Sequence, residues 1–252
     1  MKIQTSIILL LCLTLSCKSL DDQILIRPLI TTGTSFFDLE QFKDVGSKTA
    51  DLRDDLWLQM NHSDYEFAVK LENGKLMIGE PYCDQFYFEL DDGKLEIINN
   101  GEFGGEFNFI PADTSKVKKS IWEIPVNFVL EFKDKIYFFV GIAHGADQGG
   151  AMFELIRVKE HFEYKMILEL DSAPLVATIY KNKILIAGHK MFKVVEDFKK
   201  KNIIEEAFWW GLYPNNIVVK NEDEVFIGMR GGYSELSLVT GKAKFYHYMT
   251  YK

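Results

Sequence analysis

The stretch IVVKNEDEVFIG, residues 217–228, decides the fold class of this chain. It contains two runs rich in β-branched and aromatic residues on either side of the polar turn Glu222-Asp223. This pattern predicts two antiparallel strands joined by a tight turn, the second strand ending at Gly228. The same unit returns at residues 65–79, 128–141 and 175–188. We therefore expect an all-β protein built from a repeated hairpin.

A third and a fourth strand follow each hairpin, so each repeat predicts a four-stranded meander. The second strands end at Gly79, Gly141, Gly188 and Gly228, which gives intervals of 62, 47 and 40 residues. The last two intervals match the blade length of β-propellers. The predicted third strands are 86–90, 152–158, 191–195 and 233–238, and the predicted fourth strands are 95–98, 164–170, 202–207 and 244–248.

The unit from Tyr213 to Leu236 resembles a blade of the broad β-propeller superfamily, in which a strand ending in glycine leads to a second glycine, a hydrophobic residue and a leucine. The resemblance implies a β-propeller-like architecture and no catalytic residues. An insertion, Gly101–Pro125, lengthens the first interval and predicts an extra hairpin or part of another blade, so we expect four or five blades. The alternative fold is a β-sandwich, which also has many short strands.

The N-terminus has the features of a secretory signal. Lys2 is followed by the apolar run Ile7–Leu15, by Ser16 and by Cys17, and the run is too short to span a bilayer. Residues 13–17 resemble the processing site of bacterial lipoproteins, although Thr14 stands where an aliphatic residue is usual. The resemblance implies cleavage before Cys17 and lipidation of its thiol. The alternative is an ordinary cleaved signal.

The lipoprotein pattern implies attachment to the cell envelope through N-terminal acyl groups. Lys18 replaces the aspartate that retains lipoproteins at the inner membrane, and Asp21 and Asp22 resemble the acidic tether of some surface lipoproteins. We therefore expect the outer membrane or the cell surface. The predicted divisions are a signal peptide at 1–16, a tether and N-terminal segment at 17–63, and a propeller-like domain at 64–252.

Within the N-terminal segment we expect a tether to about Arg27 and two short helices, Ser35–Phe42 and Asp51–Met60, packed on the propeller or completing its first blade. The net charge of −8 disfavours a nucleic-acid partner, and Lys199–Lys201 is interpreted as a solvated turn. Cys83 has no predicted disulfide partner after processing.

The loop at residues 144–150 follows the second strand of the repeat at 128–141. It combines glycines with the polar residues His144, Asp147 and Gln148. The histidine and the aspartate suit a general base or a pair of metal ligands, and the alternative is an ordinary flexible loop. The sequence lacks zinc, calcium, P-loop, dinucleotide and nucleophile-elbow patterns. We therefore predict no metal, no cofactor and no defined catalytic residue.

Other candidate ligand-binding residues belong to an aromatic cluster, Trp209, Trp210 and Tyr213, or lie in the loops that follow the strand-ending glycines. Exposed aromatic residues stack on sugars or anchor protein partners, but they also pack between blades. The loops after second strands open on one face of a propeller, so their side chains either surround a binding mouth or form a solvated rim. These candidates are Glu80, His189, Trp209, Trp210 and Arg230.

Two functions fit these observations. The first is a non-catalytic envelope lipoprotein whose propeller-like domain binds a protein, peptide or glycan. The second is an envelope hydrolase or lyase that uses His144 and Asp147, with Arg230 as an oxyanion or carboxylate contact. The sequence favours the first because no recognisable catalytic constellation is present.

Overall fold

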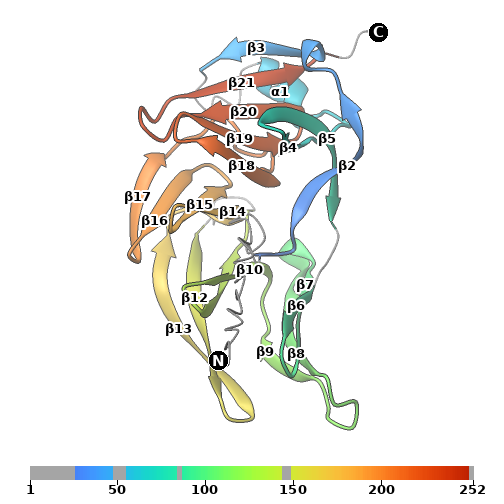
Figure 1. The fold of residues 1–252 in the computed structure, drawn as a ribbon, viewed down its shortest axis with the longest axis vertical. Coiled ribbons are helices and arrows are strands. Elements are labelled where there is room, and N and C mark those ends of the chain that lie inside the picture. The colour runs from blue at the N-terminus through green and yellow to red at the C-terminus, as the bar shows by residue number, and fades with distance from the viewer. Residues whose placement is uncertain (1–25, 48–54, 84–86, 144–148, 250–252) are drawn as a thin grey trace, which may run out of the picture.

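A computed structural model describes residues 26–47, 55–83, 87–143 and 149–249. The fold is all-β, as predicted, with five separate antiparallel sheets. Figure 1 shows these sheets one after another around the molecule, from the first at the upper right to the fifth at the top. The sheets therefore resemble the blades of a propeller, and the alternative of two packed sheets is excluded.

Each of the last three sheets contains the four-stranded meander that its repeat predicts, and the third and fifth sheets each have one further strand. Two-residue turns join their first hairpins, and at Lys133-Asp134 and Lys181-Asn182 both turn residues have positive φ, the geometry that suits the twist of a hairpin. The third sheet contains β10 (Val126–Phe132), β11 (Lys135–Gly141), β12 (Gly150–Val158) and β13 (His161–Leu170). The fourth contains β14 (Pro174–Tyr180), β15 (Lys183–Gly188), β16 (Phe192–Glu196) and β17 (Lys199–Ile204). The fifth contains β18 (Asn216–Asn221), β19 (Glu224–Met229), β20 (Gly232–Leu236) and β21 (Ala243–Tyr248).

The first predicted repeat is divided between two sheets, which corrects its assignment as one meander. β4 (Ala68–Glu72) and β5 (Lys75–Cys83) do not pair with the strands that follow them but with β2 (Ile30–Phe37). The predicted third and fourth strands begin a new sheet, and the Gly101–Pro125 insertion completes it. This second sheet contains β6 (Tyr87–Leu90), β7 (Gly93–Asn99), β8 (Gly105–Pro111) and β9 (Lys119–Trp122).

The N-terminal segment supplies strands to three sheets. β1 (Ile26–Arg27) pairs with β10, β2 pairs with β5, and β3 (Phe42–Gly46) pairs with β21. The predicted helix at Ser35–Phe42 is wrong, because the end of β2, a 3-10 turn at Leu39–Gln41 and the start of β3 occupy it. Leu39, on the expected apolar face of that helix, is exposed and does not pack in the core. Pairing of β2 and β3 with neighbouring strands instead provides hydrogen-bond partners for the backbone N–H and C=O groups.

A short helix, α1 (Asp55–Asn61), covers most of the second predicted helix, and residues 51–54 lie outside the described residues. Residues 199–201 were interpreted as a turn, but they form the first half of β17 at the outer edge of the fourth sheet. Lysines on an edge strand oppose pairing with another sheet, which accounts for their position.

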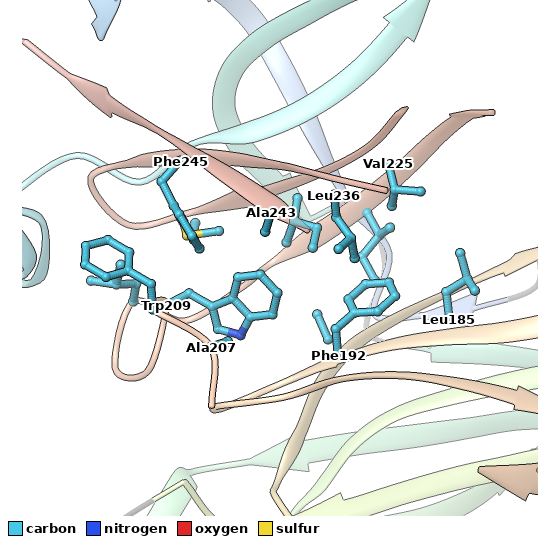
Figure 2. Close-up of a cluster of buried hydrophobic side chains, with 14 of the residues drawn as sticks. Leu185, Phe192, Ala207, Trp209, Val225, Leu236, Ala243 and Phe245 are labelled. Carbon is cyan, nitrogen blue, oxygen red and sulfur yellow. The ribbon is translucent and has the colours of Figure 1, made fainter. Parts of the chain in front are cut away.

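Four apolar clusters fill the spaces between consecutive sheets, as expected for the aromatic-rich composition. One lies between the second and third sheets, one between the third and fourth, one between the fourth and fifth, and one between the fifth and first. Figure 2 shows the cluster in which Leu185, Phe192 and Trp209 face Val225, Leu236 and Phe245 of the fifth sheet.

Asparagine side chains connect neighbouring sheets close to these clusters. The Nδ2 of Asn127 in β10 donates hydrogen bonds to the carbonyls of Gly141 (3.0 Å) and Pro174 (2.6 Å), joining the third sheet to the fourth. Asn216 in β18 makes an equivalent link from the fifth sheet to Val69 of the first. Strands of different sheets are not paired through backbone hydrogen bonds. These buried or half-buried side-chain amides instead provide partners for backbone groups of the neighbouring sheet.

Candidate binding site

The ends of the strands define two faces of the molecule. In the last three sheets the first strand begins and the second strand ends at the same side, which we call the loop face; it carries the residues after Gly141, Gly188 and Met229. The opposite side carries the turns at residues 133–134, 181–182 and 222–223, and we call it the turn face.

Arg230 directly follows β19 on the loop face, and its guanidinium is held by several groups. It donates to Oε1 of Glu66 (3.0 Å) and to the carbonyl of Asn61 (3.4 Å), and its Cζ lies 4.9 Å from the centroid of the Tyr213 ring. The Arg230 backbone N–H donates to Leu212 (2.8 Å). Arg230 is half-buried. Arg230 is therefore held in place by contacts within the protein.

Tyr213 lies beside Arg230 and leaves 41% of its surface exposed. Its φ of 53° is the left-handed conformation, which is unusual for a bulky residue, and Pro214 follows it. The ring of His189 lies 6.1 Å from the Tyr213 ring and 6.0 Å from that of Trp210, centroid to centroid. The fourth and fifth sheets thus bring together His189, Trp210 and Arg230 around Tyr213, and we call these four residues the aromatic–arginine cluster.

His189 is the buried member of this cluster, with 5% of its surface exposed. Burial, and to a lesser extent the neighbouring Lys190 charge, lowers the pKa of its imidazole to about 4. Its Nδ1 is buried and has no hydrogen-bond partner among the residues that the structure describes. The ring is therefore neutral near pH 7, and no carboxylate of the described residues is bonded to Nδ1 to orient the ring as a general base.

The remaining sequence candidates are placed differently. Trp209 is fully buried in the core and donates from Nε1 to the carbonyl of Gly188 (3.1 Å), so a surface ligand cannot contact it. Glu80 is exposed, but it lies within β5, because that strand continues to Cys83 instead of ending at Gly79. Cys17, His144, Asp147 and Gln148 lie outside the described residues.

A cavity of about 430 Å³ opens on the loop face between the second and third sheets. Ile124, Val140 and Ile142 supply apolar side chains, Gly141 and Gly150 expose backbone, and Glu102 contributes a carboxylate. Its volume is within the range of small-ligand pockets. Phe103 beside Glu102 is 85% exposed, so the apolar character continues onto the surface. Sequence reasoning did not find this cavity, because its walls come from separate sheets.

A network of charged and polar side chains lies at the loop-face end of the fourth sheet. Lys193 in β16 is buried, and its ammonium donates to Oδ2 of Asp171 and to Oδ1 of Asn202 (2.7 Å). Lys200 donates to the other Asp171 oxygen (2.8 Å). The hydrogen bonds from Lys193 and then Lys200 lower the pKa of Asp171 to about 2. Because its partners are fixed within the protein, we assign this network a structural role.

Sequence reasoning missed the partners that orient Arg230. Glu66 and Asn61 are 164 and 169 residues away from it, and no local spacing signals such a contact. Within residues 26–47, 55–83, 87–143 and 149–249, no group of three or more His, Cys, Asp or Glu side chains is arranged to hold a metal ion. Among the same residues, no helix has the length and apolar character to cross a membrane.

Comparison of the chain with models of protein families, with curated proteins and with solved structures gives no match.

Proposed function

We propose that this chain is a lipid-anchored protein of the bacterial cell envelope, at the outer membrane or cell surface, whose loop face binds a protein, peptide or glycan. The N-terminal sequence up to Cys17 supports the anchor. The propeller-like arrangement supports a binding face, since such folds present loops from several sheets on one side. Fold alone does not define function, so the proposal depends on the residues of that face.

The aromatic–arginine cluster is the observation that carries the binding role. Tyrosine, tryptophan and arginine dominate binding hot spots, because they combine apolar area with a polar group. Glu66 and Asn61 fix the guanidinium before any ligand arrives, and the backbone contact to Leu212 fixes the loop. A side chain that is already ordered loses less conformational entropy on binding. The exposed ring of Tyr213 then offers a surface for a sugar ring or an apolar side chain.

The same contacts count against hydrolysis or elimination at this cluster. The guanidinium of Arg230 is already paired with the carboxylate of Glu66, so its positive charge is not free to stabilise an oxyanion. His189 is held neutral by burial, and within the described part of the chain its Nδ1 has no partner to orient it. No contact of the described residues favours the enzymatic alternative.

A photo-crosslinking amino acid at position 213 tests the binding role in the native envelope. Tyr164, which is 47% exposed on β13, is the matched control position. We expect a discrete crosslinked product from position 213 and none from position 164. Arg230→Ala should diminish the product, because the arginine no longer supports the ring. Equal crosslinking at both positions, or no effect of Arg230→Ala, would contradict the proposal.

The anchor is tested by Cys17→Ser. This variant should lose lipid labelling and leave the membrane fraction, because the acyl groups provide the stable attachment. Membrane retention without the label would contradict the lipoprotein assignment.

A further inference from the structure

Glu66 and Arg230 present opposite charges side by side on the loop face. Glu66, just before β4, and Arg230, just after β19, form an isolated antiparallel bridge, and Nη2 of Arg230 lies 3.0 Å from Oε1 of Glu66. The Glu66 side chain is 42% exposed and that of Arg230 is 30% exposed. A carboxylate that accepts hydrogen bonds and a guanidinium that donates them are therefore both within reach of one ligand.

The charges of this pair select a neutral ligand. An acidic group placed against Arg230 would be repelled by Glu66, and a basic group placed against Glu66 would be repelled by Arg230. An apolar side chain would cover the pair without hydrogen-bonding it, which costs free energy. Lys190, whose charge acts on His189 of the cluster, is itself paired with Glu206 at 3.2 Å. The ligand that fits is therefore uncharged and carries hydrogen-bonding groups.

The Tyr213 ring beside the pair is held in place before any ligand binds. The carbonyls of residues 210, 211 and 212 accept hydrogen bonds from Nε1 of Trp57 (2.7 Å), from Nδ2 of Asn61 (2.9 Å) and from the backbone N–H of Arg230 (2.8 Å). These bonds hold Tyr213 at a φ of 53°, a strained conformation of the kind that clusters at ligand-binding sites. A ring that is fixed in this way loses little conformational entropy when a ligand stacks on it.

A pyranose ring has the chemistry that matches this arrangement. One face of such a sugar is largely C–H, and it stacks on an exposed aromatic ring such as that of Tyr213. Each sugar hydroxyl both donates and accepts hydrogen bonds, so two adjacent hydroxyls can donate to Glu66 and accept from Arg230. Cζ of Arg230 lies 4.9 Å from the centroid of the Tyr213 ring, so the polar groups and the ring are close enough to contact one sugar residue.

We infer that Tyr213, Glu66 and Arg230 form a subsite for an uncharged pyranose residue of an envelope glycan. The sugar stacks on the Tyr213 ring, one hydroxyl donates to the Glu66 carboxylate, and the adjacent hydroxyl accepts from the Arg230 guanidinium. This inference names the ligand class of the proposed binding face and rests on that proposed function. The adjacent hydroxyls that it requires form a vicinal diol, which periodate cleaves.

Periodate treatment of the envelope tests this ligand class with the full lipidated chain. Envelopes from cells that lack the protein are oxidised with periodate and reduced with borohydride, digested with protease, or left untreated. The protein carries benzoylphenylalanine at position 213, which keeps an aromatic ring there, and is purified in a detergent without sugar groups. It is then added to each envelope and irradiated. We expect a crosslinked product from the untreated and the protease-digested envelopes, and loss of that product after periodate.

Glu66→Gln tests the carboxylate separately. Glutamine keeps the size of the side chain but removes the charged acceptor, so the yield of crosslinked product should fall about tenfold, as expected for the loss of one hydrogen bond to a charged group. Glu222→Gln is the matched control, because Glu222 pairs with Lys181 at 3.2 Å on the turn face, and it should leave the yield unchanged. Melting curves verify that both variants are folded.

The contrary results differ in what they imply for the proposed function. Product that survives periodate would overturn the inference; if protease removes that product, the site binds a peptide and the loop face keeps its binding role. An unchanged yield from folded Glu66→Gln would mean that the ion pair does not contact the ligand, which would also overturn the subsite. No product from any envelope, including the untreated one, would remove the proposed binding function and the inference with it.

Discussion

The side-chain amide of Asn216 makes two hydrogen bonds to the backbone of Val69, 147 residues earlier in the chain. Its Oδ1 accepts from the Val69 N–H at 3.0 Å, and its Nδ2 donates to the Val69 carbonyl at 2.5 Å. Both bonds are buried. One side chain thus satisfies both backbone groups of Val69 and joins the fifth sheet to the first.

Replacing Asn216 by leucine should therefore destabilise the protein. The variant leaves a buried N–H and a buried carbonyl of Val69 without partners, and each unsatisfied group costs about 1–3 kcal/mol. We expect the free energy of unfolding to fall by about 2–4 kcal/mol in urea titrations. Asn100→Leu, at an exposed position whose side chain makes no capping bond, is the control and should change little. Equal stability of the two variants would contradict a stabilising role for the two hydrogen bonds between Asn216 and Val69.

Gly228 allows the fifth and first sheets to approach at the same junction. A Cβ at this position would lie 2.4 Å from the carbonyl oxygen of Phe67, and 2.6 Å from Oδ1 of Asn216. Gly228→Val should lower stability by roughly 1 to 3 kcal/mol, because backbone atoms must move apart. Gly149→Ala is the control, since its added Cβ meets no atom within 4 Å. Melting curves distinguish the two, and an unchanged melting temperature for Gly228→Val would count against this packing.

Acid should weaken the fold through His189. Because its pKa falls from 6.5 in the unfolded chain to about 4 in the folded protein, the unfolded state binds more protons between these values. Stability is therefore present above pH 6.5 and is lost as the pH falls toward 4. The loss attributable to His189 is about 3 kcal/mol at most. Burial lowers the pKa of His247 too, which acts in the same direction.

Urea unfolding at pH 7.5 and pH 4.5 measures this dependence. His189→Leu should flatten the decline between the two pH values, whereas His161→Leu, at an exposed position on β13, should retain it. Asp171, with a pKa of about 2, titrates below this window. Parallel pH profiles for wild type and His189→Leu would contradict the assignment.

The stability of the protein should depend on Asp171, because this carboxylate pairs with the buried ammonium of Lys193. Asp171→Ala removes the carboxylate and should cost about 2 kcal/mol, below the range for fully buried pairs because Asp171 is itself largely exposed. Lys193→Met in the same background should restore most of the loss, since the unpaired charge is gone. Glu72→Ala, which removes the exposed pair with Lys70, is the control and should have little effect. Failure of Lys193→Met to rescue would show that packing, not charge, dominates.

The all-β class and the last three sheets could be predicted from sequence because they depend on local patterns. Alternation of apolar residues predicts strands, and short polar turns such as Lys181-Asn182 predict their connection to the next strand. Each strand of a meander pairs with the strand that follows it in the chain, so within the meanders sequence order equals strand order. The length of the Gly101–Pro125 insertion also indicated additional strands, and it does contribute β8 and β9.

The first sheet could not be predicted, because its pairing is not local. β5 pairs with β2, which precedes it by more than 40 residues, and residues 35–42 also have the periodicity of a short helix. Strand pairing overrides such a weak local signal. The same reason applies to the site. Arg230 is visible in the sequence as a candidate contact, but its partners Asn61, at the end of α1, and Glu66, before β4, reach it only in the folded protein.

The pairing of β3 with β21 has a consequence for biosynthesis. A ribosome makes β3 before β4 to β20 and makes β21 after them, so β3 has no partner strand while those strands are synthesised. The fifth sheet is complete only when both are present. A chain interrupted before Ala243 would display two unpaired strand edges, at β3 and at β20, of the kind that promotes aggregation. The fifth sheet can therefore close only after β21 has been synthesised.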